Sequence, residues 1–307
     1  MKTNLIMVPF AYKLNANTGV NIKRVSKSLD IDLKNCCVSL ISARQYQGDD
    51  TDCALITNID IPNFYKKLLT KNGILIYKQD FDLFDFGAEY RWSLAFYKLC
   101  ALYRISRTTQ YSNYMYLDSD VVIQKSLDDI FEQCDNHMMM FNLNTMESEE
   151  EKNHFLMEVV GFNGNQNVNH YGGEFFAANK KATMDFSESA LRVFNRMLHS
   201  KYVTSHGDEF ITSITAVEYS DRICDAKDYI TRLWTGTYRQ ISNNFRMVPI
   251  LHLPAEKEYG MLHLYDKYVL REKSFPKGHD LYKICHILTP SLLTRIKCFI
   301  KFILNKE

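Results

Sequence analysis

The sequence predicts an α/β protein in which a mixed, mostly parallel sheet is flanked by helices. Three observations lead to this prediction. Short apolar runs of strand type alternate with helical stretches over the first 90 residues, as expected when crossovers connect parallel strands. A later apolar run, Tyr114–Leu117, ends abruptly in two aspartates. The chain has 307 residues, of which 46% are hydrophobic and 24% charged, so it can bury one substantial core.

The N-terminal region contains four short apolar runs bounded by polar residues, together with one run that has helical spacing. Runs of the first kind favour strands, and the second kind favours a helix. We expect the strands at Leu5–Phe10, Cys37–Ser42, Cys53–Thr57 and Gly73–Tyr77, and the helix at Phe64–Thr70.

The stretch Glu89–Ile105 is expected to form a well-buried helix, because its large apolar side chains recur at helical spacing. These side chains are Trp92, Phe96, Leu99 and Tyr103. After a polar loop, the strand Tyr114–Leu117 leads into Asp118-Ser119-Asp120. Ser126 is then the expected N-cap of a short helix.

The second half of the chain is predicted as an irregular segment followed by further strands and helices. Residues 144–170 are polar and contain an acidic run, so they indicate a solvated loop or a mobile flap over a substrate. The later elements are expected as a strand at His170–Asn179, a helix at Ser187–His199, a helix opening near Asp208, and a strand at Arg246–Leu253.

The C-terminal segment is expected to be an appendage, so that residues 1–275 form the main domain and residues 276–307 a helical tail. Thr289-Pro290-Ser291 is a favourable helix start, with proline at the first helical position. Basic residues flank an apolar arc on the helix that follows. Such a helix suits an anionic membrane interface or packing on the protein's own core. The arc consists of Leu292, Leu293, Ile296, Ile300, Ile303 and Leu304.

Composition limits the classes of partner and the compartment. The formal net charge is +1, which gives no general attraction to nucleic acid. The eight cysteines include no C-x-x-C pair, so zinc and redox dithiol sites are not indicated and a reducing, cytoplasmic compartment is expected. Because no stretch approaches the roughly 20 apolar residues of a membrane span, we expect a soluble or peripheral protein.

The two aspartates Asp118 and Asp120 are the strongest chemical signal in the sequence. A buried strand delivers both carboxylates to its end, two positions apart, where side chains point the same way in extended backbone. Two like charges in one place need a cation or hydrogen-bond donors, and Mg²⁺ and Mn²⁺ prefer carboxylate oxygens. The alternative interpretation is that these aspartates only cap the next helix.

Phosphatases of the haloacid dehalogenase type share this local pattern. Asp118-Ser119-Asp120-Val121-Val122 matches their nucleophile and acid, and Gly207-Asp208-Glu209 could supply their later acidic motif. Those enzymes usually carry the aspartates after their first strand, whereas more than a hundred residues precede them here. The phosphatase therefore remains an alternative function.

The ordered set of motifs resembles retaining glycosyltransferases of the GT-A fold, in particular families 8 and 6. The resemblance covers roughly residues 90–260 and implies a Rossmann-like mixed sheet flanked by helices. The late motif departs from the family pattern in its spacing and lacks the usual Pro-Trp. Four segments carry the resemblance, in order: WSLAFYKLCAL, LDSDVVIQKSLDDIF, HYGGEFFAANKKA followed by Asp208-Glu209, and ILHLPAEK.

The resemblance implies that Asp118 and Asp120 bind Mn²⁺ or Mg²⁺ and contact the donor's ribose and diphosphate. His252 would be the late metal ligand, with His263 as its competitor, and Lys257 would neutralise leaving phosphate charge. The further residues expected to contact the donor are Phe10, Lys98, Ser119, Gly172 and Gly173.

Three carboxylates are the candidate catalytic groups. Glu174 is expected to bind the acceptor or act as a base. Asp208 and Glu209 are expected beside the transferred sugar, where they would grip its hydroxyls and stabilise positive charge at the anomeric carbon. The alternative interpretation is that Asp208 and Glu209 only compensate the dipole of the helix that they begin. The glycine pair before Glu174 would let the backbone approach a sugar or phosphate closely.

The expected activity is transfer of a sugar, with retention, from a nucleotide-sugar to a glycan or lipid-linked acceptor. The resemblance favours a UDP-sugar, and the basic tail favours an acceptor of the lipopolysaccharide or capsule type at the inner face of the plasma membrane. A non-catalytic carbohydrate-binding protein is the remaining alternative. A nucleotidyltransferase is disfavoured because residues 5–20 contain no glycine-rich phosphate loop.

Overall fold

A computed structural model describes residues 3–13, 22–23, 27–87, 90, 92–143, 153–155, 168–202, 204 and 206–304. The sequence interpretation of residues 144–170 as a loop or flap falls largely outside these residues.

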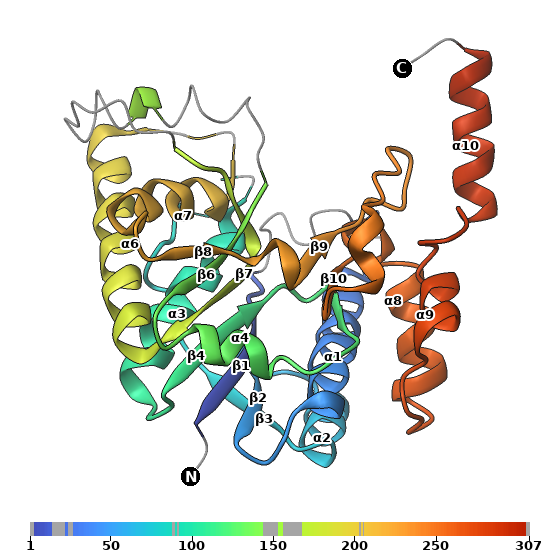
Figure 1. The fold of residues 1–307 in the computed structure, drawn as a ribbon, viewed down its shortest axis with the longest axis horizontal. Helices are drawn as coiled ribbons and strands as arrows, with labels where there is room; N and C mark the ends of the chain where they lie inside the picture. Colours follow the sequence, from blue (N-terminus) through green and yellow to red (C-terminus); the bar gives the residue numbers. More distant parts are fainter. Residues whose placement is uncertain are drawn as a thin grey trace.

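A seven-stranded mixed sheet forms the centre of the molecule (Figure 1). Its strand order is β3-β2-β1-β4-β7-β6-β8. The first four of these strands run parallel, and β7 is antiparallel to both of its neighbours. The predicted α/β class and mixed sheet are confirmed. The strands span Asn4–Phe10 (β1), Thr51–Thr57 (β2), Ile74–Lys78 (β3), Asn113–Leu117 (β4), Met138–Asn142 (β6), Tyr171–Asn179 (β7) and Ile223–Asp225 (β8).

A smaller sheet of three strands continues from the end of β4. It contains β5 (Val121–Ile123), β10 (Ile250–His252) and β9 (Ile230–Arg232), in that order. β10 is antiparallel to β5, which places His252 opposite Val121, and parallel to β9, which places it beside Arg232. The expected strand Arg246–Leu253 is therefore shorter than predicted, because a 3-10 turn, η7 (Asn243–Arg246), occupies its beginning.

Helices cover both faces of the large sheet (Figure 1). α1 (Ser28–Tyr46) and α2 (Asn63–Lys71) pack on one face. α3 (Tyr97–Thr108), α6 (Lys180–Ser200) and α7 (Asp208–Ala216) pack on the other. In β1, Ile6 and Val8 join the core under α1, while Leu5 and Met7 join the core under α3. This alternation is the period of two of an extended strand that is buried on both faces.

The predicted strand at Cys37–Ser42 is wrong, because these residues lie inside α1. Twelve of the 19 residues of α1 are buried, and they cover most of the circumference of the helix. A helix buried over most of its circumference lacks the clear amphipathic period that identifies surface helices. Its apolar run therefore cannot be told from a buried strand by periodicity.

Three predicted helix starts differ from those in the structure. The Glu89–Ile105 helix begins as a 3-10 turn, η2 (Ser93–Phe96), before α3. α6 begins seven residues earlier than expected, at Lys180, because the Asn179 side chain accepts the Ala182 N–H as an N-cap. Ser126 accepts the backbone N–H of Asp128, so α4 (Asp128–Gln133) starts one residue later than expected.

The C-terminal elements up to residue 287 pack into the core that contains α1. α8 (Gly260–Leu264) continues into the π-helical turn η9 (Tyr265–Val269), and α9 (Gly278–Ile284) follows. Three further 3-10 turns, η5 (Val217–Tyr219), η6 (Ala226–Asp228) and η8 (Pro254–Glu256), connect the preceding elements.

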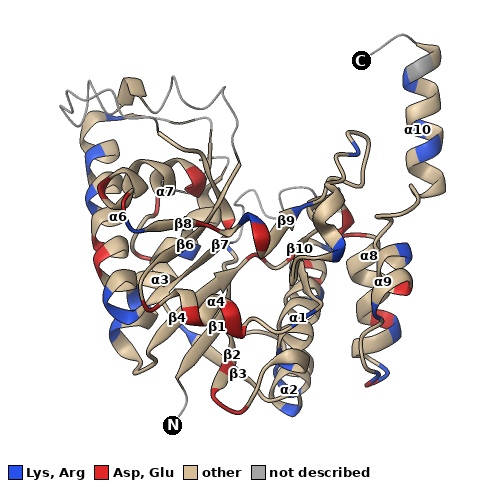
Figure 2. Ribbon diagram, viewed as in Figure 1, with Lys and Arg blue, Asp and Glu red and all other residues tan. Residues whose placement is uncertain are grey.

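The last helix, α10 (Leu292–Ile303), projects away from the body, and Lys and Arg residues recur along it (Figures 1 and 2). Pro290 precedes this helix, and Ser291 caps it by accepting the Thr294 N–H, which corrects the expected proline start. All six residues of the predicted apolar arc are at least 45% exposed. No helix among the described residues combines the length and apolar character needed to span a bilayer.

Candidate metal and donor site

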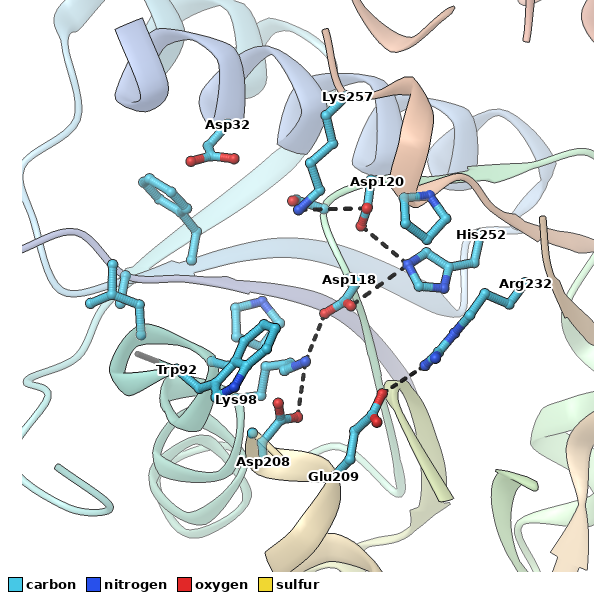
Figure 3. Close-up of a pocket in the computed structure, with 18 of the residues that line it drawn as sticks. Asp32, Trp92, Lys98, Asp118, Asp120, Asp208, Glu209, Arg232, His252 and Lys257 are labelled. Carbon is cyan, nitrogen blue, oxygen red and sulfur yellow. Dashed lines mark hydrogen bonds and ion pairs between the residues drawn. The ribbon is translucent and has the colours of Figure 1, made fainter. Parts of the chain in front are cut away.

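A cavity of about 360 Å³ opens at the carboxyl edge of the large sheet (Figure 3). Its walls come from the ends of β1 and β4, the second turn of α1, the first turn of α7, the start of α3, and the small sheet. Ligands of α/β proteins bind at this edge because the loops there are free to carry functional side chains. Nine residues predicted from the sequence line the cavity: Phe10, Lys98, Asp118, Ser119, Asp120, Asp208, Glu209, His252 and Lys257.

Asp118, Asp120 and His252 converge in this cavity. One ligand atom from each residue lies within 4.8 Å of the others. The His252 Nε2 atom is 3.5 Å from Asp120 Oδ1 and 3.8 Å from Asp118 Oδ2. Asp120 Oδ1 is buried and accepts no hydrogen bond from any described residue. Two carboxylates and one imidazole nitrogen form a donor set that fits Mn²⁺ or Mg²⁺.

The other ring nitrogen of His252 faces a second carboxylate. Nδ1 lies 3.2 Å from Glu174 Oε1, and Glu174 is completely buried. A carboxylate behind a histidine fixes the ring's orientation and turns its free nitrogen toward a metal. Burial alone would lower the pKa of His252, but the Asp120 and Glu174 charges raise this pKa to about 9.

Lys257 brings a positive charge to the other side of Asp120. Its Nζ atom is 3.5 Å from Asp120 Oδ2, and its side chain is 14% exposed toward the cavity. Burial favours the neutral acid of Asp120, yet Lys257 and His252 hold the pKa of this carboxyl well below its usual range. Asp120 is therefore ionised and faces both cations.

Lys98 is surrounded by oxygen atoms of the protein. Its Nζ atom lies 2.9 Å from Asp118 Oδ1, 2.9 Å from Asp208 Oδ2 and 2.7 Å from the Gly173 carbonyl oxygen. Nζ donates hydrogen bonds to Asp118 and to the Gly173 carbonyl, and its contact with Asp208 is an ion pair. Lys98 lines the cavity, but it fixes Asp118 and Asp208 instead of reaching out from a solvated helix face.

Arg232 lies at the centre of a second ion network in the cavity wall. It binds both carboxylate oxygens of Glu174, at 2.8 and 2.6 Å, and reaches Glu209 Oε1 at 2.7 Å. The second oxygen of Glu209 is 2.9 Å from His170 Nε2. Burial would raise the pKa of Glu209, but His170 and Arg232 together hold it well below its usual range. Glu209 is therefore a paired carboxylate.

The glycine pair makes room for these networks. A Cβ atom on Gly172 would lie 2.0 Å from Glu174 Oε2, and one on Gly173 would lie 2.3 Å from Asp208 Oδ2. The expected reason for these glycines, close approach of the backbone to a ligand, is not what the structure shows. Neither glycine lines the cavity. Their missing side chains leave the space in which two buried ion pairs form.

Two other predicted residues also lie away from the cavity. Glu174 was expected to meet the acceptor, but its carboxylate is fully buried between Arg232 and His252. His263 has an exposed side chain on α8 and does not belong to the metal-type cluster found among the described residues. Of the two competing histidines, the geometry brings His252 to the aspartates.

Several cavity residues were not identified from the sequence. Arg232 and Asp32 face the cavity from β9 and α1, and no local motif marks either residue. Trp92 and Trp234 also line it, and they are the only two tryptophans in the chain. Their rarity was an available signal, since large aromatic side chains are favoured in ligand pockets.

The arrangement agrees with a comparison against solved structures. The apo structure of mouse xyloside xylosyltransferase 1 aligns with a TM-score of 0.51 and 12% identity, over 81% of this chain and 97% of that one. The apo structure of the bifunctional glycosyltransferase WbbM aligns with a TM-score of 0.55 and 10% identity. That alignment covers 92% of this chain and 52% of WbbM, so the chain spans about half of that protein.

These similarities define the fold as that of glycosyltransferases of the GT-A type, as predicted. No protein-family model matches the sequence, and no curated protein matches it. The assignment to families 8 and 6 therefore stays a resemblance in sequence motifs.

Proposed function

We propose that this chain is a metal-dependent glycosyltransferase that moves a sugar from a UDP-sugar to a glycan or lipid-linked acceptor. The observation that supports this proposal best is the convergence of Asp118, Asp120 and His252 at the carboxyl edge of a GT-A sheet. The fold does not favour the phosphatase alternative, since the aspartates follow the fourth strand of the large sheet in chain order.

The cluster and Lys257 provide a binding place for the donor's diphosphate. Asp118, Asp120 and His252 would hold Mn²⁺ or Mg²⁺, and this ion supplies positive charge for the departing diphosphate. Lys257 adds a second positive charge beside Asp120. Charges that are fixed in a partly closed cavity stabilise a transition state without first having to reorganise.

Asp208 and Glu209 would contact the transferred sugar. Both begin α7 and line the cavity beside Asp118. Glu209 is ionised by its pairing with Arg232 and His170, so it can stabilise positive charge that develops at the anomeric carbon. Burial raises the pKa of Asp208 to about 7, against the opposing charge of Lys98. Asp208 would accept hydrogen bonds from sugar hydroxyls.

Retention is the stereochemistry that we propose. The bond between the anomeric carbon and the diphosphate oxygen breaks while the acceptor hydroxyl bonds to the same face of that carbon. The hydroxyl proton passes to the departing diphosphate. Inversion needs an available base. The burial of Glu174, the pairing of Glu209 with Arg232 and the pairing of Asp208 with Lys98 therefore support retention. A short-lived adduct with Glu209 would also give retention, and inversion at the anomeric proton by NMR would contradict both routes.

The test of the activity is a thermal-shift screen of nucleotide-sugars with and without Mn²⁺, followed by an assay of nucleoside diphosphate release. We expect Mn²⁺-dependent stabilisation by one nucleotide-sugar and release of its diphosphate when an acceptor glycan is added. Ligand binding that needs neither metal nor nucleotide would support the carbohydrate-binding alternative. Metal-dependent hydrolysis of p-nitrophenyl phosphate without sugar transfer would support the phosphatase.

We also propose that the acceptor is a growing lipopolysaccharide or capsule chain at the inner face of the plasma membrane. The exposed apolar arc of α10, together with Arg295, Lys297 and Lys301, suits an anionic lipid surface. Co-sedimentation with anionic and zwitterionic liposomes tests the membrane contact that this proposal requires. Binding should prefer anionic lipid and should be lost when residues 289–307 are removed, and unchanged binding after removal would contradict it.

A further inference from the structure

Asp32 is a cavity residue to which neither the sequence motifs nor the mechanism above gives a role. It comes from the second turn of α1 and faces the cavity (Figure 3). In this view Asp32 lies at one end of the cavity, Asp208 and Glu209 lie at the other, and Asp118 lies between them. The cavity therefore presents carboxylates at both ends.

Among the residues that the structure describes, none makes a direct polar contact with the Asp32 carboxylate. The residue is 8% exposed, and no residue in the described part of the chain donates it a hydrogen bond or forms an ion pair with it within 4 Å. Asp30, two residues earlier on the same helix, binds the Tyr65 hydroxyl and lies 2.7 Å from Lys34 Nζ. A nearly buried carboxylate without donors is costly, which is a reason to expect that a ligand supplies them.

The charges near Asp32 identify which part of a donor would meet it. Burial raises the pKa of Asp32 to about 6, opposed by Lys257 and assisted by Asp120. Asp32 is therefore close enough to feel the two residues that flank the proposed diphosphate site. At neutral pH it is largely ionised, and an ionised carboxylate has two oxygens that can only accept hydrogen bonds.

The order of groups in a nucleotide-sugar then assigns the two ends of the cavity. The sugar is on one side of the diphosphate, and the nucleoside is on the other. If the sugar meets Asp208 and Glu209, the nucleoside must extend toward Asp32 and the end of β1. The ribose is the first group on that side, and it carries two adjacent hydroxyl donors. The base lies one group further away.

We propose that Asp32 accepts hydrogen bonds from the 2′- and 3′-hydroxyls of the donor's ribose and so selects ribonucleotides. This inference rests on the proposed function, because it takes the diphosphate to lie at Asp118, Asp120 and Lys257. Acidic residues bind ribose hydroxyls in the same chemical manner in dinucleotide-binding folds. The proposal gives Asp32 a binding role and no part in bond making.

Calorimetric titration of UDP, 2′-deoxy-UDP and 3′-deoxy-UDP in the presence of Mn²⁺ tests the proposal. The proteins are the wild type, Asp32→Ala, Asp32→Asn and the control Asp30→Asn. A charged hydrogen bond contributes a factor of about 10 to 100 in affinity. Wild type should therefore bind UDP more tightly than the deoxy nucleotides by about this factor. In Asp32→Ala the affinity for UDP should fall to about that for the deoxy nucleotides, so that the preference for UDP is lost. Asp32→Asn should show an intermediate preference, and Asp30→Asn should match the wild type.

The melting temperature without ligand separates a binding role from a structural one. Removal of an unpartnered buried charge should leave the melting temperature of Asp32→Asn unchanged or higher. A lower melting temperature together with an unchanged preference for UDP over its deoxy forms would overturn the proposal. The proposal would also be overturned if Asp32→Ala lowered the affinities for UDP and for both deoxy nucleotides by the same factor. A changed preference between UDP and CDP would assign Asp32 to the base instead.

Different results would refute the proposed function and the ribose contact of Asp32. If the wild type binds none of UDP, GDP, ADP and CDP with Mn²⁺, the proposed function fails and this inference fails with it. If the wild type binds UDP and Asp32→Ala binds it equally well, only the ribose contact is refuted.

Discussion

Replacement of Arg232 with methionine should destabilise the protein severely, although Arg232 is a residue of the cavity wall. Its guanidinium makes hydrogen bonds of 2.8, 2.6 and 2.7 Å to Glu174 and Glu209. Glu174 has no exposed side-chain surface, and without Arg232 its one remaining side-chain partner among the described residues would be His252. Glu209 would keep His170 and the Gly173 N–H. The largest part of the cost therefore falls on Glu174.

The magnitude follows from the burial of this pair. Loss of one partner from a buried ion pair costs about 3–5 kcal/mol, and methionine keeps part of the packing of the arginine stem. For a chain of this size each kcal/mol corresponds to about 2 °C in melting temperature, so we expect a fall of roughly 6–10 °C. Urea denaturation and thermal melting followed by circular dichroism measure both quantities.

A matched control is Arg192→Met. Arg192 binds Glu218 at 3.2 Å, but the two side chains are 55% and 52% exposed, and exposed pairs contribute about 0–1 kcal/mol. A second variant, Arg232→Met combined with Glu174→Gln, should recover part of the lost stability, because position 174 would no longer carry a buried charge without its arginine partner. The reasoning is refuted if Arg232→Met costs no more than Arg192→Met, or if the added glutamine makes it worse.

Three further predictions concern the metal cluster, the glycine pair and the C-terminal region. Asp120→Asn should abolish the Mn²⁺-induced rise in melting temperature and lower turnover by roughly 10³-fold, since a metal contributes several kcal/mol to such reactions; an unchanged Mn²⁺ shift would contradict the cluster. Gly173→Ala should lower the unfolding free energy by about 1–3 kcal/mol, because its Cβ would lie 2.3 Å from Asp208 Oδ2, which pairs with Lys98. In the same urea titration, the control Gly48→Ala should stay within about 0.5 kcal/mol of the wild type. A hydrogen bond to the buried Glu256 raises the pKa of His286. The extra stability of the wild type over His286→Gln should therefore be present below about pH 6.5 and disappear as the pH rises through the raised pKa. Urea midpoints at about pH 6 and pH 9 measure this difference, with the exposed His279→Gln as the control, and a difference that did not shrink at the higher pH would contradict the prediction.

The parts of the site that were predictable are those written in adjacent residues. Asp118 and Asp120 follow an apolar strand directly, so the sequence itself shows that both carboxylates reach one strand end. The start of α7 at Asp208 was also predictable, because acidic residues open an apolar helical stretch there. The placement of His252 came from the resemblance, and the pairing of β10 with β5 provides its physical basis.

The parts that were not predictable depend on contacts between distant residues. Arg232 meets Glu174 from 58 positions away along the chain, and no pattern around either residue announces this pair. The role that the structure gives to Gly172 and Gly173 could not be predicted either. A glycine is visible in the sequence, but the structure is needed to show which carboxylate fills its space: Glu174 of the same strand for Gly172, and Asp208 at the start of α7 for Gly173.

Secondary structure shows the same division. The parallel strands β1, β2, β3 and β4 were recognisable because each is a short apolar run between polar residues, whereas β6 and β8 were not predicted. The Cys37–Ser42 error arose where burial over most of the helix circumference removed the periodic signal that separates helix from strand. Helix starts were displaced where a side-chain cap such as Asn179 decided the boundary, since a cap depends on the local backbone as well as on residue type.

The two tryptophans of the chain also have a practical consequence. Both tryptophans line one cavity, so the tryptophan emission of the protein, excited selectively above the tyrosine absorption, originates beside its proposed substrates. A nucleotide, a metal ion or a sugar that enters should change the intensity or wavelength of this emission without any attached dye. The native chain therefore carries an optical reporter of occupancy, and stopped-flow mixing could follow the order in which metal, donor and acceptor arrive.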